Sequence, residues 1–187
     1  VFLDPEHRTV RFLRPGVEIK LGSIGKGYAL DRMVEWLADS GKVSSALLHG
    51  GSSSLYALGD AQPGAIGWKV RVRHPWRPGK HLIELRLRDR AMATSAATFQ
   101  HFVHKGRRFG HILDPRDGLP AAGVASATVL APTGALADAL STAFYVGGEE
   151  LARSYCESHG DIAVVMLTEG KREPTVLNLP SSDYTFF

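Results

Sequence analysis

The sequence contains a single cysteine, Cys156, and no long apolar run. One cysteine excludes an internal disulfide and a cysteine-rich metal site. No apolar stretch approaches the ~20 residues that a membrane-spanning helix needs, and no signal peptide is visible. Because the chain opens at Val1 without an initiator methionine, we expect a processed, excised or incompletely supplied polypeptide. The sequence therefore leaves the compartment unknown.

Charge of one sign is also scarce, since the net charge is +3 over 187 residues. Lysine and arginine are scattered apart from two short groups, at 71–77 and 105–108. This mild excess gives no argument for a nucleic-acid face, and it suits a phosphate-bearing ligand as well as it suits solubility. No repeat, linker or low-complexity tract is present. A chain of this length fits one domain with a substantial core.

Short apolar or alternating runs bounded by turns predict a chain rich in strands. The expected strands are 1–3, 9–13, 17–21, 45–49, 55–58, 68–72, 82–88, 99–103, 125–130 and 162–167. Helices are expected after the glycines at 22–27 as far as Gly41, from about 134 to 145, and at 149–159. The apolar stripe expected on the first of these helices is Ile24, Tyr28, Met33, Val34 and Leu37. Hairpins interspersed with isolated helices predict an α+β fold with mostly antiparallel sheets.

A glycine-rich stretch, 22–31, enters the first predicted helix. Backbone N–H groups at such an entry converge on an anion, and the helix dipole favours negative charge there. Lys26 adds a point charge. The spacing is neither the phosphate-loop motif nor the dinucleotide fingerprint. A plain tight connection between strand and helix explains the glycines equally well.

A second candidate lies at 110–120, where His111, Asp114 and Asp117 sit at the predicted junction of a strand and a loop. We expect Ile112 and Leu113 to form the buried end of the strand. A proline after Asp114 and an Asp-Gly pair predict a rigid turn. Loops held on a rigid scaffold often carry catalytic groups. The alternative is a polar turn with an incidental histidine.

A third candidate pair, Asp138 and Thr142, lies four residues apart on the predicted helix at 134–145. Residues at this spacing share one helix face. A carboxylate and a hydroxyl are oxygen ligands suited to Mg²⁺. The alternative is an ordinary polar stripe. On the metal reading, we predict that Asp138→Ala abolishes turnover with little loss of fold.

Taken together and in this order, four stretches of the chain resemble the ApbE family of FAD:protein FMN transferases. They are Leu21 to Asp31, Gly50-Gly51-Ser52, Thr94-Ser95, and His111 to Pro120 continued by 137–143. The resemblance covers almost the whole chain. It implies one ApbE-like α+β domain over 1–187 that lacks the family's usual N-terminal segment. The chain departs from the family pattern at Lys20 and Ser52, where acidic residues are common.

The implied activity is Mg²⁺-dependent transfer of FMN from FAD to a threonine hydroxyl of a partner flavoprotein, releasing AMP. His111 would be catalytic, and the metal ligands would be Asp138, Thr142 and the carbonyl of Gly25. The implied FAD contacts are Ser23, Lys26, Gly27, Tyr28, Gly50, Gly51, Thr94, Ser95, His111 and Ile112. The resemblance also implies a periplasmic or membrane-anchored protein. The alternatives are an FAD pyrophosphatase and a non-catalytic FAD-binding protein.

Overall fold

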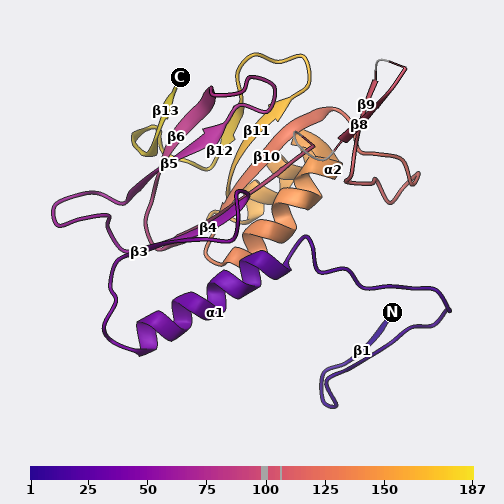
Figure 1. Ribbon diagram of the computed structural model, residues 1–187, viewed down its shortest axis with the longest axis horizontal. Helices are drawn as coiled ribbons and strands as arrows, with labels where there is room; N and C mark the ends of the chain where they lie inside the picture. Colours follow the sequence, from indigo (N-terminus) through magenta and orange to yellow (C-terminus); the bar gives the residue numbers. More distant parts are fainter. Residues whose placement is uncertain (98–100, 106) are drawn as a thin grey trace.

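The computed structural model describes residues 1–97, 101–105 and 107–187. Its centre is an antiparallel six-stranded sheet in the order β12-β11-β10-β7-β4-β3 (Figure 1). The strands, in that order, are Thr175–Leu177, Ala163–Thr168, Val124–Ala131, Arg90–Ala96, Ser54–Leu58 and Ala46–His49. The helices are α1 (Gly25–Asp39) and α2 (Gly134–Ser158). Helix α2 packs on one face of this sheet, and α1 packs against α2 and β4.

A second sheet, β13-β6-β5, packs on the opposite face. Its strands are Tyr184–Phe186, His81–Leu87 and Trp68–Arg73, and a 3-10 turn at Ser181–Asp183 leads into β13. Two separate hairpins complete the structure. They are β1 (Phe2–Asp4) with β2 (Thr9–Arg11), and β8 (His101–His104) with β9 (Arg107–Gly110). In the described part of the chain, no helix is long and apolar enough to cross a membrane.

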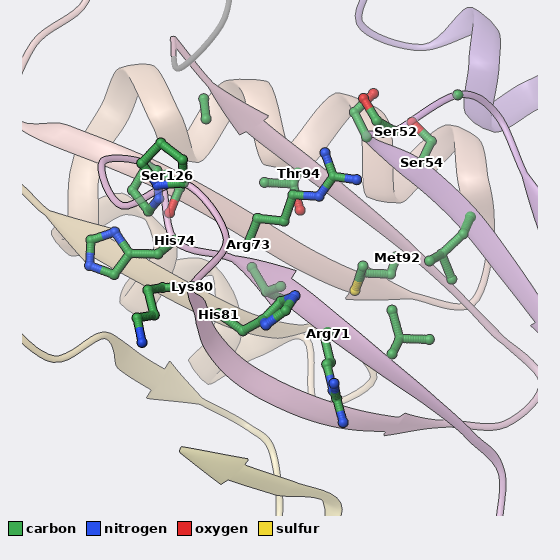
Figure 2. A pocket seen from close by; sticks show the side chains of 18 of the residues that line it. Ser52, Ser54, Arg71, Arg73, His74, Lys80, His81, Met92, Thr94 and Ser126 are labelled. Atoms are coloured by element: carbon green, nitrogen blue, oxygen red, sulfur yellow. The ribbon is translucent and has the colours of Figure 1, made fainter. Parts of the chain in front are cut away.

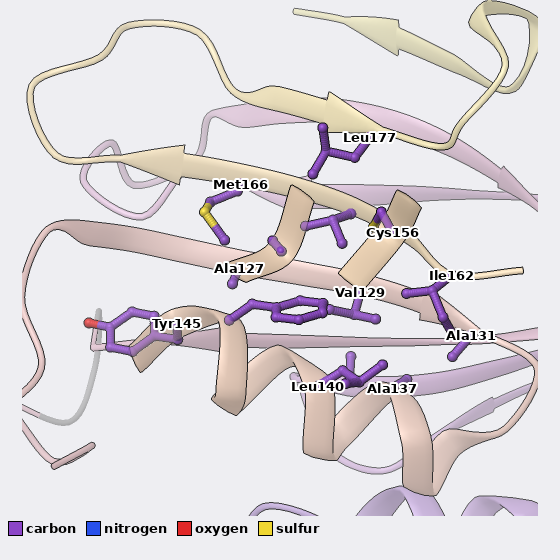
Figure 3. Close-up of a cluster of buried hydrophobic side chains, with 14 of the residues drawn as sticks. Ala127, Val129, Ala131, Ala137, Leu140, Tyr145, Cys156, Ile162, Met166 and Leu177 are labelled. Atoms are coloured by element: carbon purple, nitrogen blue, oxygen red, sulfur yellow. The ribbon is translucent and has the colours of Figure 1, made fainter. Parts of the chain in front are cut away.

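The central strand β10 is buried along its whole length because both of its faces are covered. Ala127 and Val129 belong to the core beneath α2, whereas Leu130 belongs to the core against the second sheet. Figure 3 shows the first core, where Leu140 and Tyr145 of α2 lie beside the sheet. The side chains of β10 are small or apolar apart from the buried hydroxyls of Ser126 and Thr128, as expected of a strand covered on both faces.

The α+β prediction is confirmed, with mostly antiparallel sheets. The strand predicted at 17–21 is wrong. Every residue from 1 to 24 except Asp4 is exposed, and no strand forms between β2 and α1. The N-terminal hairpin lies apart from the rest of the chain (Figure 1). An alternating segment becomes a strand only where a partner strand and a buried face are available, and 17–21 has neither in this structure.

Helix α1 also differs from its prediction. Gly27 and Leu30 are its buried residues, while Ile24, Tyr28 and Met33 are exposed. Val34 and Leu37 of the predicted stripe are half-buried, so the face turned inward contains these two residues together with Gly27 and Leu30.

The two helices predicted at 134–145 and 149–159 are confirmed, because α2 consists of two helical segments that meet at a kink at Gly148. Gly148 has φ 80° and ψ −173°, a conformation that breaks the helical path and favours glycine. Leu113 is exposed rather than buried, and it forms an isolated antiparallel bridge with Pro120. Strand β8 begins at His101, and the predicted start at residue 99 lies outside the described residues.

Candidate functional site

The site begins where α1 crosses α2 at two glycines. A Cβ added to Gly27 would lie 1.9 Å from the carbonyl oxygen of Gly134. A Cβ added to Gly134 would lie 2.5 Å from the carbonyl oxygen of Gly27. Only glycine allows two backbones to approach this closely. The carboxylate of Asp31 also accepts the backbone N–H groups of Gly134 and Ala135, so α1 caps the N-terminus of α2.

Asp138 is the buried centre of the site, with 4% of its surface exposed. Its Oδ2 accepts the backbone N–H of Gly27 at 2.7 Å, and its Oδ1 accepts the hydroxyl of Ser54 at 2.6 Å. The Nζ of Lys26 lies 3.7 Å from Oδ2 and donates to the carbonyl oxygen of Gly22 at 3.1 Å. The N-terminal turn of α1 therefore does bind an anion, and that anion is the protein's own carboxylate.

Three hydroxyl groups lie one turn further along α2. Thr142 Oγ1 donates to the carbonyl oxygen of Asp138 at 3.3 Å, and Ser141 Oγ donates to the same oxygen at 2.9 Å. Ser95 Oγ, on β7, lies 2.9 Å from Ser141 Oγ and 3.1 Å from Thr142 Oγ1. Side chains from α1, β4, β7 and α2 thus form one connected polar cluster, in which the carboxylate and the Thr142 hydroxyl lie on the same side of α2.

The loop that carries His111 is anchored by Asp114. Its carboxylate accepts hydrogen bonds from the side chain and from the backbone N–H of Arg116. These bonds lower the pKa of Asp114 to about 2. The guanidinium of Arg116 also donates to the carbonyl oxygen of Val146 on α2, at 3.3 Å. His111 is exposed, between Gly110, which lies against Ala97, and Ile112, which packs on the core beneath α2. The loop is therefore attached to the helix that carries Asp138.

Comparison with known proteins assigns this arrangement to a family. The family model described as "ApbE family" matches residues 1–166.

The chain belongs to the ApbE family.

Among curated relatives, the FAD:protein FMN transferase of Rhodobacter capsulatus is 38% identical, covering 86% of this chain and 30% of that protein. The enzyme of the same name from Treponema pallidum is 32% identical, covering 88% and 47%. The chain thus spans less than half the length of these two relatives. The crystal structure of the ApbE protein from Thermotoga maritima superposes with a TM-score of 0.78 at 32% identity, covering 94% of this chain and 55% of that one.

Several of the FAD contacts implied by the family lie around Asp138. Lys26 and Gly27 contact it directly, and Ser95 reaches it through Thr142. Gly50 lies against α1, since a Cβ there would be 3.4 Å from the Cβ of Lys26. Ser23 and Tyr28 are exposed at the same end of α1.

Thr94 does not belong to this cluster. Neighbouring strand residues point to opposite faces of a sheet, so Thr94 points away from α2, and its Oγ1 bonds Thr128 at 2.9 Å. Together with Gly51, Thr94 lines a cavity bounded by β5 and the loop that follows it. The family resemblance grouped Thr94 with Ser95 as FAD contacts, but their side chains lie on opposite faces of β7.

The donor set around Asp138 is suited to Mg²⁺ rather than to a softer metal. No group of three His, Cys, Asp or Glu side chains that could hold a metal occurs in the described residues. Mg²⁺ typically binds one or two carboxylates together with water and substrate phosphates. Each oxygen of Asp138 accepts one hydrogen bond and, as a carboxylate oxygen, retains further acceptor capacity. The residues present thus fit this ion.

Sequence reasoning gave no role to Ser54, Ser141 or Asp31. Ser141 had a detectable signal, because it lies three residues after Asp138 and shares its helix face. Asp31 had a weaker one, as an acidic residue one turn after Gly27. Ser54 had none, since it is one of three consecutive serines and only the folded chain brings it to Asp138, 84 residues away.

Proposed function

We propose that this chain carries the site of an FAD:protein FMN transferase. Its curated relatives have that name and are more than twice as long as the part that this chain matches. The observation that supports it best is the buried Asp138 carboxylate, bound to the N-terminal turn of α1 beside Lys26, with the Thr142 hydroxyl one turn away. The reaction breaks the bond between the FMN phosphorus and the bridging oxygen. It forms a phosphoester to a threonine oxygen of the acceptor and releases AMP.

The residues around Asp138 are suited to a pyrophosphate. Asp138, Thr142 and the carbonyl of Gly25, the first residue of α1, would hold Mg²⁺. When bound, the ion would neutralise charge on the pyrophosphate and polarise it. Lys26, whose side chain is 42% exposed, remains accessible to a phosphate while it lies 3.7 Å from the carboxylate. Phosphoryl transfer depends mainly on such positioning and charge neutralisation.

His111 is proposed to take the proton of the acceptor hydroxyl. An imidazole can accept and release a proton near neutral pH. Its exposure suits a role toward a protein acceptor, because a second protein can reach only surface groups. The ion pair of Asp114 with Arg116, and the bond from Arg116 to α2, hold the loop in place. A periplasmic or membrane-anchored location, implied by the resemblance, is part of the proposal.

The test incubates the protein with FAD, Mg²⁺ and a threonine-bearing flavoprotein acceptor, and separates the products by mass spectrometry. The proposal predicts covalent FMN on the acceptor and an equal amount of AMP. Free FMN with AMP would indicate a pyrophosphatase instead. An FAD complex without products would indicate a binding protein, and either of these results contradicts the transferase.

A second test addresses His111. At saturating FAD, His111→Ala should slow transfer by roughly 10²–10⁴-fold, the usual scale of general acid–base catalysis. FAD affinity should stay unchanged, because a neutral imidazole adds little to the binding of a dianion. The nearby substitution Asp117→Asn, on the same loop, is the matched control. A single-turnover rate within a few-fold of the parent would remove His111 from the proposed mechanism.

A further inference from the structure

A cavity of about 680 Å³ lies on the face of the central sheet opposite α2. Its floor is formed by Leu55, Val70 and Met92, which belong to the core between the two sheets. The loop at 74–80 forms one wall. Cavities of this volume with an apolar lining and a few convergent polar groups typically bind small molecules.

The rim of this cavity is cationic. Figure 2 shows Arg71, Arg73 and Lys80 around it, together with His74 and His81. Arg77 also lines the cavity. Among the described residues, no aspartate or glutamate lines the cavity. Arg71 is neutralised by Glu84, with Nε 2.9 Å from Oε2. Within the described residues, no carboxylate lies within ion-pair distance of Arg73, Arg77 or Lys80.

The loop at 74–80 is held in place by its own hydrogen bonds. The backbone N–H of His74 donates to the carbonyl oxygen of Lys80 at 2.9 Å, and that of Lys80 donates to the carbonyl oxygen of Arg77 at 3.0 Å. The Nδ1 of His74 accepts the backbone N–H of Trp76 at 3.1 Å, so the proton of a neutral ring is on Nε2. The backbone of this loop is therefore held by bonds within the chain itself.

The cavity lies on the opposite face of the central sheet from the cluster around Asp138, although Gly51 and Thr94, which line it, are among the FAD contacts that the family implies. Thr94 lines the cavity, whereas the adjacent Ser95 points to the other face and bonds Thr142. The two sites share one border, the turn at 51–53 and Ser54 at the start of β4. Ser54 lines the cavity and also donates to Asp138.

We propose that this cavity is a second ligand site, which binds an organic phosphate monoester. One arginine guanidinium can donate two parallel hydrogen bonds to the oxygens of a phosphate. Three cations without carboxylate partners match the two negative charges of a phosphate monoester better than the one charge of a carboxylate ligand. The apolar floor of Leu55, Val70 and Met92 would receive the organic body of the ligand. A concave site of this size suits a small molecule rather than the flat surface of a protein. The proposal does not depend on the transferase activity.

The test measures binding of AMP and FMN by calorimetry without added Mg²⁺, with adenosine and riboflavin as the uncharged counterparts. At least one phosphate monoester should bind ten-fold or more tightly than its counterpart and shift the methyl resonance of Met92. Whichever of AMP and FMN binds more tightly identifies the source of the phosphate. Arg73→Ala and Lys80→Ala should each weaken binding by roughly ten-fold, the size of one charge-assisted hydrogen bond.

Two controls make this test specific. Arg86→Ala removes an exposed cation of β6 outside the cavity and should change nothing. Lys26→Ala alters the other site and should also leave this binding intact. The proposal is overturned by equal affinity for AMP and adenosine together with equal affinity for FMN and riboflavin. It is also overturned by binding that Lys26→Ala abolishes, by binding that Arg73→Ala and Lys80→Ala leave unchanged, or by capture of an acidic protein with neither nucleotide bound.

Discussion

The contacts of Asp138 predict that two substitutions at this one position will have different effects on stability. Asp138→Ala leaves two buried donors, the N–H of Gly27 and the hydroxyl of Ser54, without their acceptor. An unsatisfied buried donor costs about 1–3 kcal/mol, so the free energy of unfolding should fall by about 2–6 kcal/mol. Lys26 adds little to this loss, because its side chain is 42% exposed. The sequence-based expectation of little loss of fold is therefore revised.

Asp138→Asn should be much milder. The amide oxygen accepts one of the two donors, and the Ser54 hydroxyl can rotate to accept from the amide nitrogen. The free energy of unfolding should then fall by about 1–2 kcal/mol, because charge-assisted hydrogen bonds are replaced by neutral ones. Urea unfolding of both variants measures the difference, and a double-mutant cycle with Ser54→Ala isolates the shared bond. An alanine variant no less stable than the asparagine variant would refute the role of Asp138 in holding α1 to the sheet and α2.

Two further predictions concern the helix crossing and the His111 loop. Gly27→Ala should lower stability by about 3 kcal/mol or prevent folding, because its Cβ meets the backbone of Gly134 rather than a flexible side chain. In urea unfolding, Gly22→Ala is the control, since nothing lies within 4 Å of a Cβ there, and equal losses would contradict the close crossing. Because the folded pKa of Asp114 lies at about 2, below its ordinary 3.8, the loop's stabilisation is present above pH 4 and is lost as pH falls toward 2. The amide resonance of Arg116 should titrate with a midpoint near pH 2, and a midpoint near 4 would show that the ion pair does not persist in solution.

Local sequence patterns predicted most of the strands, because runs such as β11 are apolar almost throughout and short enough to favour a strand buried on both faces. The same reasoning failed at 17–21, where an equally good alternating pattern finds no partner strand. Whether a segment pairs depends on the rest of the fold, which local alternation does not encode.

Sequence reasoning named Lys26, Gly27, Asp138 and Thr142, but it missed Ser54 and Ser141 of the same cluster and the bonds that connect them. Spacing alone placed Asp138 and Thr142 on one helix face. Local patterns also indicated Lys26 and His111, and the family resemblance supplied their expected roles. The bond from Gly27 to Asp138 joins residues 111 positions apart, and no local pattern indicates it. The cavity was out of reach for the same reason, because Arg73 and Met92 meet only when two sheets stack. Contacts across the sequence come from packing, which the sequence specifies only through the whole fold.

The most direct test of the proposed site is the single-turnover rate of covalent FMN formation by Asp138→Asn. The measurement uses saturating FAD and Mg²⁺, on variant protein shown by urea unfolding to be folded. If Asp138 holds the ion that neutralises the pyrophosphate, the rate should fall by at least roughly 10²-fold, the scale expected when a preorganised charge is removed. A folded Asp138→Asn protein that transfers FMN at the parent rate would contradict the assignment of the reaction to this cluster.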